Sequence, residues 1–323
     1  ALQQSQKALA SQLAAQSIAL VDTQPDLSFL LSLEANYIGD QLGASDPAWL
    51  GSLATTLNSS PKLGTYLRAH QSDVRALAFS PDGRWLVTAG GIPSGDTGEA
   101  YLWDLKAGKN KYQKLNTGNT NRFLSVAFSP DGKTFVTAGD GKQLFVWNPD
   151  QCCDPIHQWP VTDKVRSIKF VTVKGVEYLA AATGNQVTFW NVATGEQQTD
   201  LTLKIEAVDD TLRVLSLAFA PTTHELAAGS EDGAITVWDL ESGEKKFRVC
   251  SYGEVVQSGP TPCDVVDTDV KEIRGLAFNA DASLLLSGSS DQHAWLWNAQ
   301  SGELLTQTPD RNEGGHINTV TSV

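Results

Sequence analysis

The chain has 323 residues, of which 41% are hydrophobic and 19% are charged, a composition typical of a soluble globular protein. Its formal net charge of −13 argues against free nucleic acid or an anionic membrane surface as the main partner, because both would repel it. The sequence contains no signal peptide, no apolar run long enough to span a membrane and no methionine, so we expect an internal piece of a larger protein.

Residues 1–60 predict three short amphipathic helices. The first is rich in Ala, Gln and Leu, which favour helix. Thr23 and Pro25 predict the start of a second helix that ends at Gly39 to Gly43, and Asp46 predicts the start of a third that stops before Pro61. We expect a packed linker or cap, with a peptide groove as the alternative. The stripes expected to form its core are Leu2, Leu9, Leu13 and Leu20, then Leu27, Leu30, Leu31 and Ile38, then Leu50, Leu53 and Leu57.

A β-hairpin is repeated in the next part of the chain. The stretch AFSPDGRWLVTAG begins at Ala78 and returns as AFSPDGKTFVTAG from Ala127. Pro81 and Asp82 suit the centre of a tight turn, and Gly83 accepts the left-handed backbone that follows it. The stretch therefore predicts two antiparallel strands.

A third strand in each copy ends in a tryptophan that is followed by Asp or Asn. A period near 40 to 45 residues with a terminal Trp-Asp predicts the four-stranded blade of a propeller. These tryptophans are Trp103, Trp147, Trp190, Trp238 and Trp297.

On these motifs the chain resembles the WD-repeat β-propeller family, with a mainly β propeller in residues 62–323 after the helical region of residues 1–60. We expect five complete repeats and the start of a sixth at Gly315, His316 and Val320. Seven blades are common in the family, so the resemblance implies a seven-bladed ring truncated beyond Val323. Residues 62–69 are then the outer strand that closes the ring.

The family links a His, a Ser or Thr, a turn Asp and the Trp within a repeat. His70, Thr88 and Trp103 match this pattern in the first repeat, and Asp232 and Asp291 match the turn Asp in the fourth and fifth. No repeat keeps all four residues, so we expect core packing to hold the blades more than this polar network does.

The sequence shows no catalytic motif and no metal-ligand spacing, so we expect no enzyme activity and no cofactor. Calcium binding by the acidic stretches 206–210 and 263–269 is a hypothesis that competes with a solvated acidic rim. The adjacent Cys152 and Cys153 are poorly placed to bond to each other. Cys250 and Cys263 can bridge in an oxidising compartment, but we favour free thiols.

One charged residue precedes the first strand of every repeat. Loops on a rigid scaffold often carry recognition, so we expect these residues to form a ring on one face that contacts a protein or peptide. The competing interpretation is that they only keep the face soluble. The ring positions are Asp73, Arg122, Lys164, Arg213 and Glu272.

Residues 1–38 resemble the helical region that precedes propellers in bacterial, often cyanobacterial, signalling proteins similar to the signal-transduction NTPases with numerous domains. This resemblance implies a non-catalytic cytoplasmic scaffold or sensor, which an upstream transmembrane helix can tether. The alternatives are a propeller enzyme with its active site at the central channel and a purely structural assembly unit.

Overall fold

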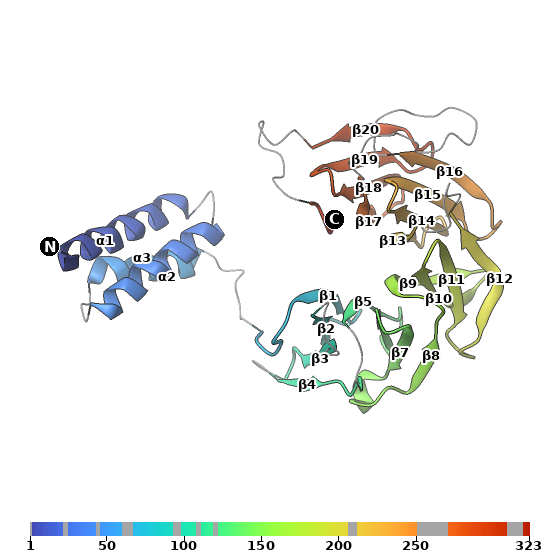
Figure 1. The fold of residues 1–323 in the computed structure, drawn as a ribbon, viewed down its shortest axis with the longest axis horizontal. Helices are drawn as coiled ribbons and strands as arrows, with labels where there is room; N and C mark the ends of the chain where they lie inside the picture. The colour runs from blue at the N-terminus through green and yellow to red at the C-terminus, as the bar shows by residue number, and fades with distance from the viewer. Residues whose placement is uncertain are drawn as a thin grey trace. The chain divides into compact units, whose positions relative to one another are not determined.

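The computed structural model describes residues 2–21, 25–42, 46–59, 67–92, 98–107, 111–118, 122–205, 212–250, 271–308 and 319–323. The chain forms two compact units, Ala1–Leu67 and Arg68–Val323. The first unit is helical, and the second contains five four-stranded antiparallel sheets (Figure 1). The predicted mainly β fold, preceded by helices, is confirmed.

Three helices make up the first unit: α1 (Leu2–Leu20), α2 (Pro25–Gln41) and α3 (Pro47–Ser59). Asp46 caps α3, because its Oδ1 accepts a hydrogen bond of 2.8 Å from the Ala48 amide. The predicted end of the second helix between Gly39 and Gly43 is confirmed, since α2 ends at Gln41.

Small side chains and Trp49 fill most of the interface between these helices, and Leu13 and Ile38 are the members of the predicted stripes that pack against this core. Small residues let helix backbones approach closely, and their hydroxyl groups find partners there: Ser28 donates to the Ser17 carbonyl at 2.7 Å. The leucine-stripe prediction is wrong for Leu9, Leu27, Leu30 and Leu50, which are exposed. The buried residues are Ala10, Ala14, Ser17, Ser28, Ser32, Ala35, Trp49, Ser52 and Thr56.

The second unit consists of five blades, which we number in chain order. Each blade is a sheet of four consecutive strands paired antiparallel. Blade 1 contains β1 (Val74–Phe79), β2 (Trp85–Gly91), β3 (Gly98–Asp104) and β4 (Tyr112–Lys114). Blade 2 contains β5 (Phe123–Phe128), β6 (Phe135–Gly139), β7 (Gln143–Trp147) and β8 (His157–Pro160), with a short 3-10 helix at Pro149–Gln151 before β8.

The remaining blades have the same order. Blade 3 contains β9 (Val165–Val173), β10 (Val176–Thr183), β11 (Gln186–Asn191) and β12 (Gln197–Lys204). Blade 4 contains β13 (Val214–Ala220), β14 (Glu225–Ser230), β15 (Ala234–Asp239) and β16 (Lys245–Cys250). Blade 5 contains β17 (Ile273–Phe278), β18 (Leu284–Ser289), β19 (Ala294–Asn298) and β20 (Leu304–Gln307).

The predicted hairpin turn is present in both copies of the repeated stretch. The Gly83 amide donates to the Ser80 carbonyl at 2.9 Å, and Gly83 has a φ of 67°. Ser80 Oγ donates to Asp82 Oδ1 at 2.6 Å, and this bond lowers the pKa of the Asp82 carboxyl. Ser129 and Asp131 make the same contact at 2.7 Å in the second copy.

The residue after each blade tryptophan turns the chain toward the fourth strand. Asp104 Oδ1 accepts from the amides of Lys106 and Ala107, both at 3.0 Å. This arrangement is an Asx turn, which explains why only Asp or Asn follows the tryptophans. The equivalent acceptors in blades 2 to 5 are Asn148, Asn191, Asp239 and Asn298.

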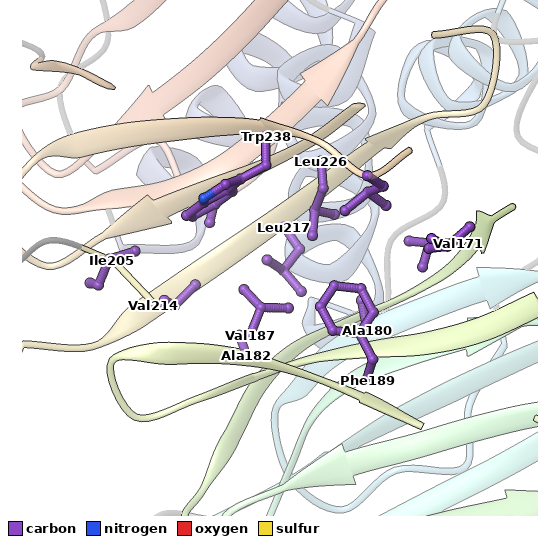
Figure 2. Close-up of a cluster of buried hydrophobic side chains, with 13 residues drawn as sticks. Val171, Ala180, Ala182, Val187, Phe189, Ile205, Val214, Leu217, Leu226 and Trp238 are labelled. Atoms are coloured by element: carbon purple, nitrogen blue, oxygen red, sulfur yellow. The ribbon is translucent and has the colours of Figure 1, made fainter. Parts of the chain in front are cut away.

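The hydrophobic cores lie between blades and not within them. In one such core, Leu217, Leu226 and Trp238 of blade 4 face the side chains of blade 3 (Figure 2). Each further pair of consecutive blades shares a cluster of its own. A single blade therefore cannot bury its apolar surface alone, which is why the unit is repeated.

The first face of blade 1 is not covered by a preceding blade among the described residues. Leu77 is 60% exposed and Phe79 is 59% exposed, whereas Leu217, at the position equivalent to Leu77, is 2% exposed. Figure 1 shows the blades as an arc that starts at β1 and ends near β20. Beyond blade 5, the Val320 amide donates a hydrogen bond of 3.0 Å to the Ser289 carbonyl of that blade. A similar bond joins blade 4 to blade 3, where the Val214 amide donates to the Gly184 carbonyl at 2.8 Å.

The proposed ring-closing strand, residues 62–69, lies outside the described residues up to position 66. Residues 67–69 are described and are not in a strand. The expected truncation of a seven-bladed ring stays a prediction.

The expectation of a free thiol is wrong for Cys250, and the structure also pairs the two adjacent cysteines. Cys152 and Cys153 form a disulfide across a cis peptide bond, and their Cα atoms lie 3.1 Å apart. The expectation that these adjacent cysteines are poorly placed to bond to each other is therefore wrong. Cys250 is also disulfide-bonded, and Cys263 lies outside the described residues.

Candidate functional site

The five predicted ring positions lie at the entry to the first strand of each blade. At four of them the backbone carbonyl accepts a hydrogen bond of 3.0 or 3.1 Å from a backbone amide. The donor is the last residue of the second strand in blade 1 and the residue after that strand in the other three blades. These donor and acceptor pairs are Gly91 to Asp73, Asp140 to Arg122, Glu231 to Arg213, and Ser290 to Glu272. Lys164 directly precedes β9 in the same way. The ring positions are therefore equivalent points on one face of the propeller.

Glycine in the last two positions of the second strand allows this close contact. A Cβ atom on Gly90 would lie 1.9 Å from the Asp73 carbonyl oxygen, and one on Gly139 would lie 2.2 Å from the Arg122 carbonyl oxygen. Both distances are far below van der Waals contact. The repeated TAG sequence thus fixes the backbone that carries Asp73 and Arg122.

Most ring side chains form ion pairs on this face. Arg122 Nε contacts Asp140 Oδ2 at 2.6 Å, and Lys164 Nζ lies 3.5 Å from the other oxygen of the same carboxylate. Arg213 lies 3.9 Å from Glu231. Arg122 is mostly buried by its pair, whereas the side chains of Lys164 and Arg213 are 49% and 48% exposed.

The polar network of blade 1 links four side chains. Trp103 Nε1 donates to Thr88 Oγ1 at 2.9 Å, so the Thr88 hydroxyl is free to donate to His70 Nε2, which lies 2.8 Å away. His70 Nδ1 then faces Glu99, whose Oε2 is 3.5 Å away. Glu99 is therefore the carboxylate of this network in blade 1, where the sequence analysis identified no turn Asp. Burial lowers the pKa of His70, although Glu99 opposes this effect.

The same tryptophan bond is present in two further blades and absent from a third. Trp147 donates to Thr137 at 3.1 Å, and Trp297 donates to Ser287 at 2.9 Å. Trp190 Nε1 is buried without a partner, because Ala181 occupies the position of the hydroxyl residue. Blade 3 therefore relies on packing, including a stacked contact of 5.8 Å between the ring centroids of Trp159 and Trp190.

Asp232 and Asp291 lie in the turns between the second and third strands of blades 4 and 5. Asp291 accepts from the His293 amide at 2.9 Å, and Asp232 accepts from the Ala234 amide at 3.2 Å. Asp232 also pairs with Arg248. Both residues therefore stabilise turns. Trp238 is buried in the core between blades 3 and 4.

The acidic stretches proposed for calcium, 206–210 and 263–269, lie outside the described residues. Within the described part of the chain, no group of three or more His, Cys, Asp or Glu residues could hold a metal ion. No helix in that part is long and apolar enough to cross a membrane.

Sequence reasoning missed a second set of residues, which face the central channel. In blades 1, 2, 4 and 5 the pairing of the first two strands skips one residue, so that this residue forms a β-bulge. In blade 3 the equivalent bulge contains Arg166 and Ser167. The bulged positions are Arg75, Leu124, Arg166, Leu215 and Arg274.

All five bulged residues line a cavity of about 520 Å³ between the inner strands. A second cavity of about 220 Å³ shares Arg166 and Arg274 with it and adds Lys169. The signal in the sequence was the second residue of each inner strand, which alternates between Arg and Leu along the chain.

The fold and this channel define a β-propeller arc of four-stranded blades. Four segments of the chain match the family model described as "WD domain, G-beta repeat": residues 61–104, 110–148, 204–239 and 265–298. The chain therefore carries WD40 repeats. Blade 3 lies between two matched segments and has the same four-stranded sheet, although its sequence departs from the pattern.

Among curated proteins, the chain is similar to WD repeat-containing protein 1 of Gallus gallus, at 23% identity over 76% of this chain and 37% of the relative. It is also similar to the probable cytosolic iron-sulfur protein assembly protein 1 of Candida glabrata, at 28% identity over 44% of this chain and 39% of the relative. Protein transport protein Sec31A of Danio rerio is 24% identical over 53% of this chain and 13% of the relative. The chain thus spans less than two fifths of the length of each.

Proposed function

We propose that this chain is a non-catalytic scaffold or sensor module that binds a protein or peptide partner on the propeller face carrying the ring positions. WD40 propellers typically serve as protein-interaction scaffolds. The observation that carries the proposal is the repeated backbone contact that holds charged residues at equivalent points of one face. A rigid array of this kind presents several contacts at once with little loss of conformational entropy.

The ion pairs decide how this proposal is best tested. Arg122 makes the shorter ion pair with the buried Asp140 carboxylate, so reversing its charge would place two like charges together, leave Asp140 only the longer contact with Lys164, and destabilise blade 2. Lys164 and Arg213 are half exposed and suit substitution better. We therefore choose the double variant Lys164→Ala, Arg213→Ala for affinity capture from a native lysate.

We expect the wild-type chain to enrich a partner and the double variant to lose most of that enrichment. A matched control replaces two lysines away from this face, Lys106→Ala and Lys133→Ala, whose side chains are 65% and 82% exposed. Equal enrichment by wild type and the Lys164→Ala, Arg213→Ala variant, with equal melting temperatures, would contradict the proposal.

We also propose that the module belongs to a larger bacterial signalling protein, in which partner binding is relayed through the helical unit to an upstream effector. The resemblance of residues 1–38 supports this context, while the relatives named above are eukaryotic. The proposed location is the cytoplasm, with an upstream membrane tether as the alternative. Disulfides are more usual in oxidising compartments, so alkylation and mass spectrometry of Cys152 and Cys153 from native cells is the direct check.

A further inference from the structure

The channel between the inner strands contains cations that its neighbours do not fully neutralise. Arg75 pairs with Asp73 at 3.0 Å in a solvent-exposed contact, and Arg274 pairs with Glu272. Arg166 lies 3.9 Å from Glu231, which Arg213 also contacts at 3.9 Å. Glu231 therefore serves two arginines at once, at distances too long for strong hydrogen bonds.

Lys169 is exposed and adds a further cation to the lining of the same channel. It lines the cavity that also contains Arg166 and Arg274, and within the described residues it has no carboxylate partner. The equivalent residues of the other four blades are alanines, namely Ala78, Ala127, Ala218 and Ala277.

The bulge explains why these side chains share one cavity. A bulge inserts an extra residue into one strand and redirects its side chain, and bulges are frequent beside binding sites. In blade 3 the pairing moves from Ile168 with Ala181 to Val165 with Thr183, so Arg166 lies in the bulge and Lys169 follows it. Arg166 and Lys169 both line the smaller cavity, and Arg274 reaches it from blade 5.

We propose that this channel, through Arg75, Arg166, Lys169 and Arg274, binds the carboxylate side chains of an acidic segment of the partner protein. Arginine can bind a carboxylate through two parallel hydrogen bonds, and a lysine with no partner inside a cavity gains an opposite charge when an acid enters. The inference rests on the proposed partner-binding function and specifies the chemistry of that partner. The chain's net charge of −13 does not favour acidic segments in general, so their binding has to come from this local cluster of cations.

The repeat itself supplies conservative variants for the test. Leucine occupies the bulge in blades 2 and 4, so Arg166→Leu and Arg274→Leu place there a residue that the fold already accepts. Alanine occupies the Lys169 position in the other four blades, so Lys169→Ala is equally compatible with the strand. Lys133→Ala, on an 82% exposed side chain, is the matched control.

The measurement is fluorescence anisotropy of a labelled hexaglutamate peptide with the full chain at low salt. We expect saturable binding to wild type that weakens as salt rises, a loss of at least about tenfold in affinity for Lys169→Ala, and no measurable binding for Arg166→Leu, Arg274→Leu. Lys133→Ala should bind as wild type does, and labelled hexalysine should not bind.

Two outcomes of this assay would overturn the inference. One is no binding of hexaglutamate to wild type; if inorganic phosphate binds in its place with the same dependence on Arg166 and Lys169, the channel is a small-anion site. The other is unchanged binding of hexaglutamate by folded channel variants. If the partner is captured by the channel variants but lost from Lys164→Ala, Arg213→Ala, the proposed function stands and this inference fails.

Discussion

At the scale of single residues, one position in the second strand decides whether the blade tryptophan is hydrogen-bonded. Thr88, Thr137 and Ser287 accept the indole N–H in blades 1, 2 and 5. Ala181 leaves the Trp190 N–H buried without a partner. A buried donor without an acceptor costs about 1 to 3 kcal/mol, so blade 3 carries an avoidable penalty.

Ala181→Thr should therefore be more stable than Ala181→Val by about 1 kcal/mol in urea denaturation, because only threonine offers the Trp190 indole an acceptor. The two side chains have nearly the same shape, so overpacking at this fully buried site affects both equally. In an apolar site valine is normally the more stable of the two. A valine variant at least as stable as the threonine variant would show that the indole has another partner.

The network of His70 predicts a dependence on pH. Burial holds the pKa of His70 below its ordinary value of about 6.5, so between these values the unfolded chain binds more protons than the folded protein. The contribution of His70 to stability is complete above that range and is lost as the pH falls through it. Glu99 faces Nδ1, and the Tyr101 ring lies 4.7 Å from the imidazole.

We expect urea midpoints measured from pH 8 to pH 5 to fall more steeply for wild type than for His70→Asn. The variant lacks the titrating ring but keeps a polar side chain beside Thr88. Parallel pH profiles for the two proteins would mean that His70 titrates alike in the folded and unfolded states.

At the scale of elements, the helical unit inverts the usual relation between residue size and burial. Ala35, Ser28 and Ser32 are fully buried in α2, while Leu30 of the same helix is 61% exposed. Pro25 and Asp46 predicted where α2 and α3 begin. Leucine periodicity was right for Leu13 and Ile38, which pack against the core, and wrong for the exposed leucines. Periodicity identifies an apolar stripe, and it cannot show that close helix approach at small residues costs less free energy than burying leucine.

Ala35→Leu should destabilise the helical unit by about 1 to 3 kcal/mol, because there is no space for the larger side chain between the helices. Leu30→Gln should change its stability by less than about 0.5 kcal/mol, since the side chain is already in water. Hydrogen exchange of the helical peptides, followed by mass spectrometry in the full chain, measures both. Faster exchange in Leu30→Gln than in Ala35→Leu would restore the predicted leucine core.

At the scale of the whole molecule, blades depend on their neighbours, and blade 1 has one uncovered face among the described residues. Leu217 and Leu77 occupy the same repeat position, and they differ only in whether a preceding blade packs against them. This pair therefore measures what the contact between blades contributes.

Leu217→Ala should cost about 2 to 5 kcal/mol of stability, as is usual for a leucine that is 2% exposed. Leu77→Ala, at 60% exposure, should cost less than about 1 kcal/mol. Chemical denaturation of the full chain followed by tryptophan fluorescence compares them. Equal losses would indicate that Leu77 is covered in solution.

The blade pattern could be predicted because it depends on local chemistry: the SPDG turn, the Asx turn after each tryptophan and the spacing of the tryptophans. The ring positions could be located for the same reason. Their pairing could not, since Asp140 joins Arg122 to Lys164 across two blades. The channel cations also escaped prediction, because a β-bulge reverses the alternation from which facing side chains are inferred.

The most direct test of partner binding at the propeller face is site-specific photo-crosslinking in native lysate. A photoreactive residue in place of Arg213, on the proposed face, should capture the partner. The same residue in place of Thr199, exposed on the outer strand β12, should capture none. Capture from Thr199 but not from Arg213 would contradict partner binding at this face.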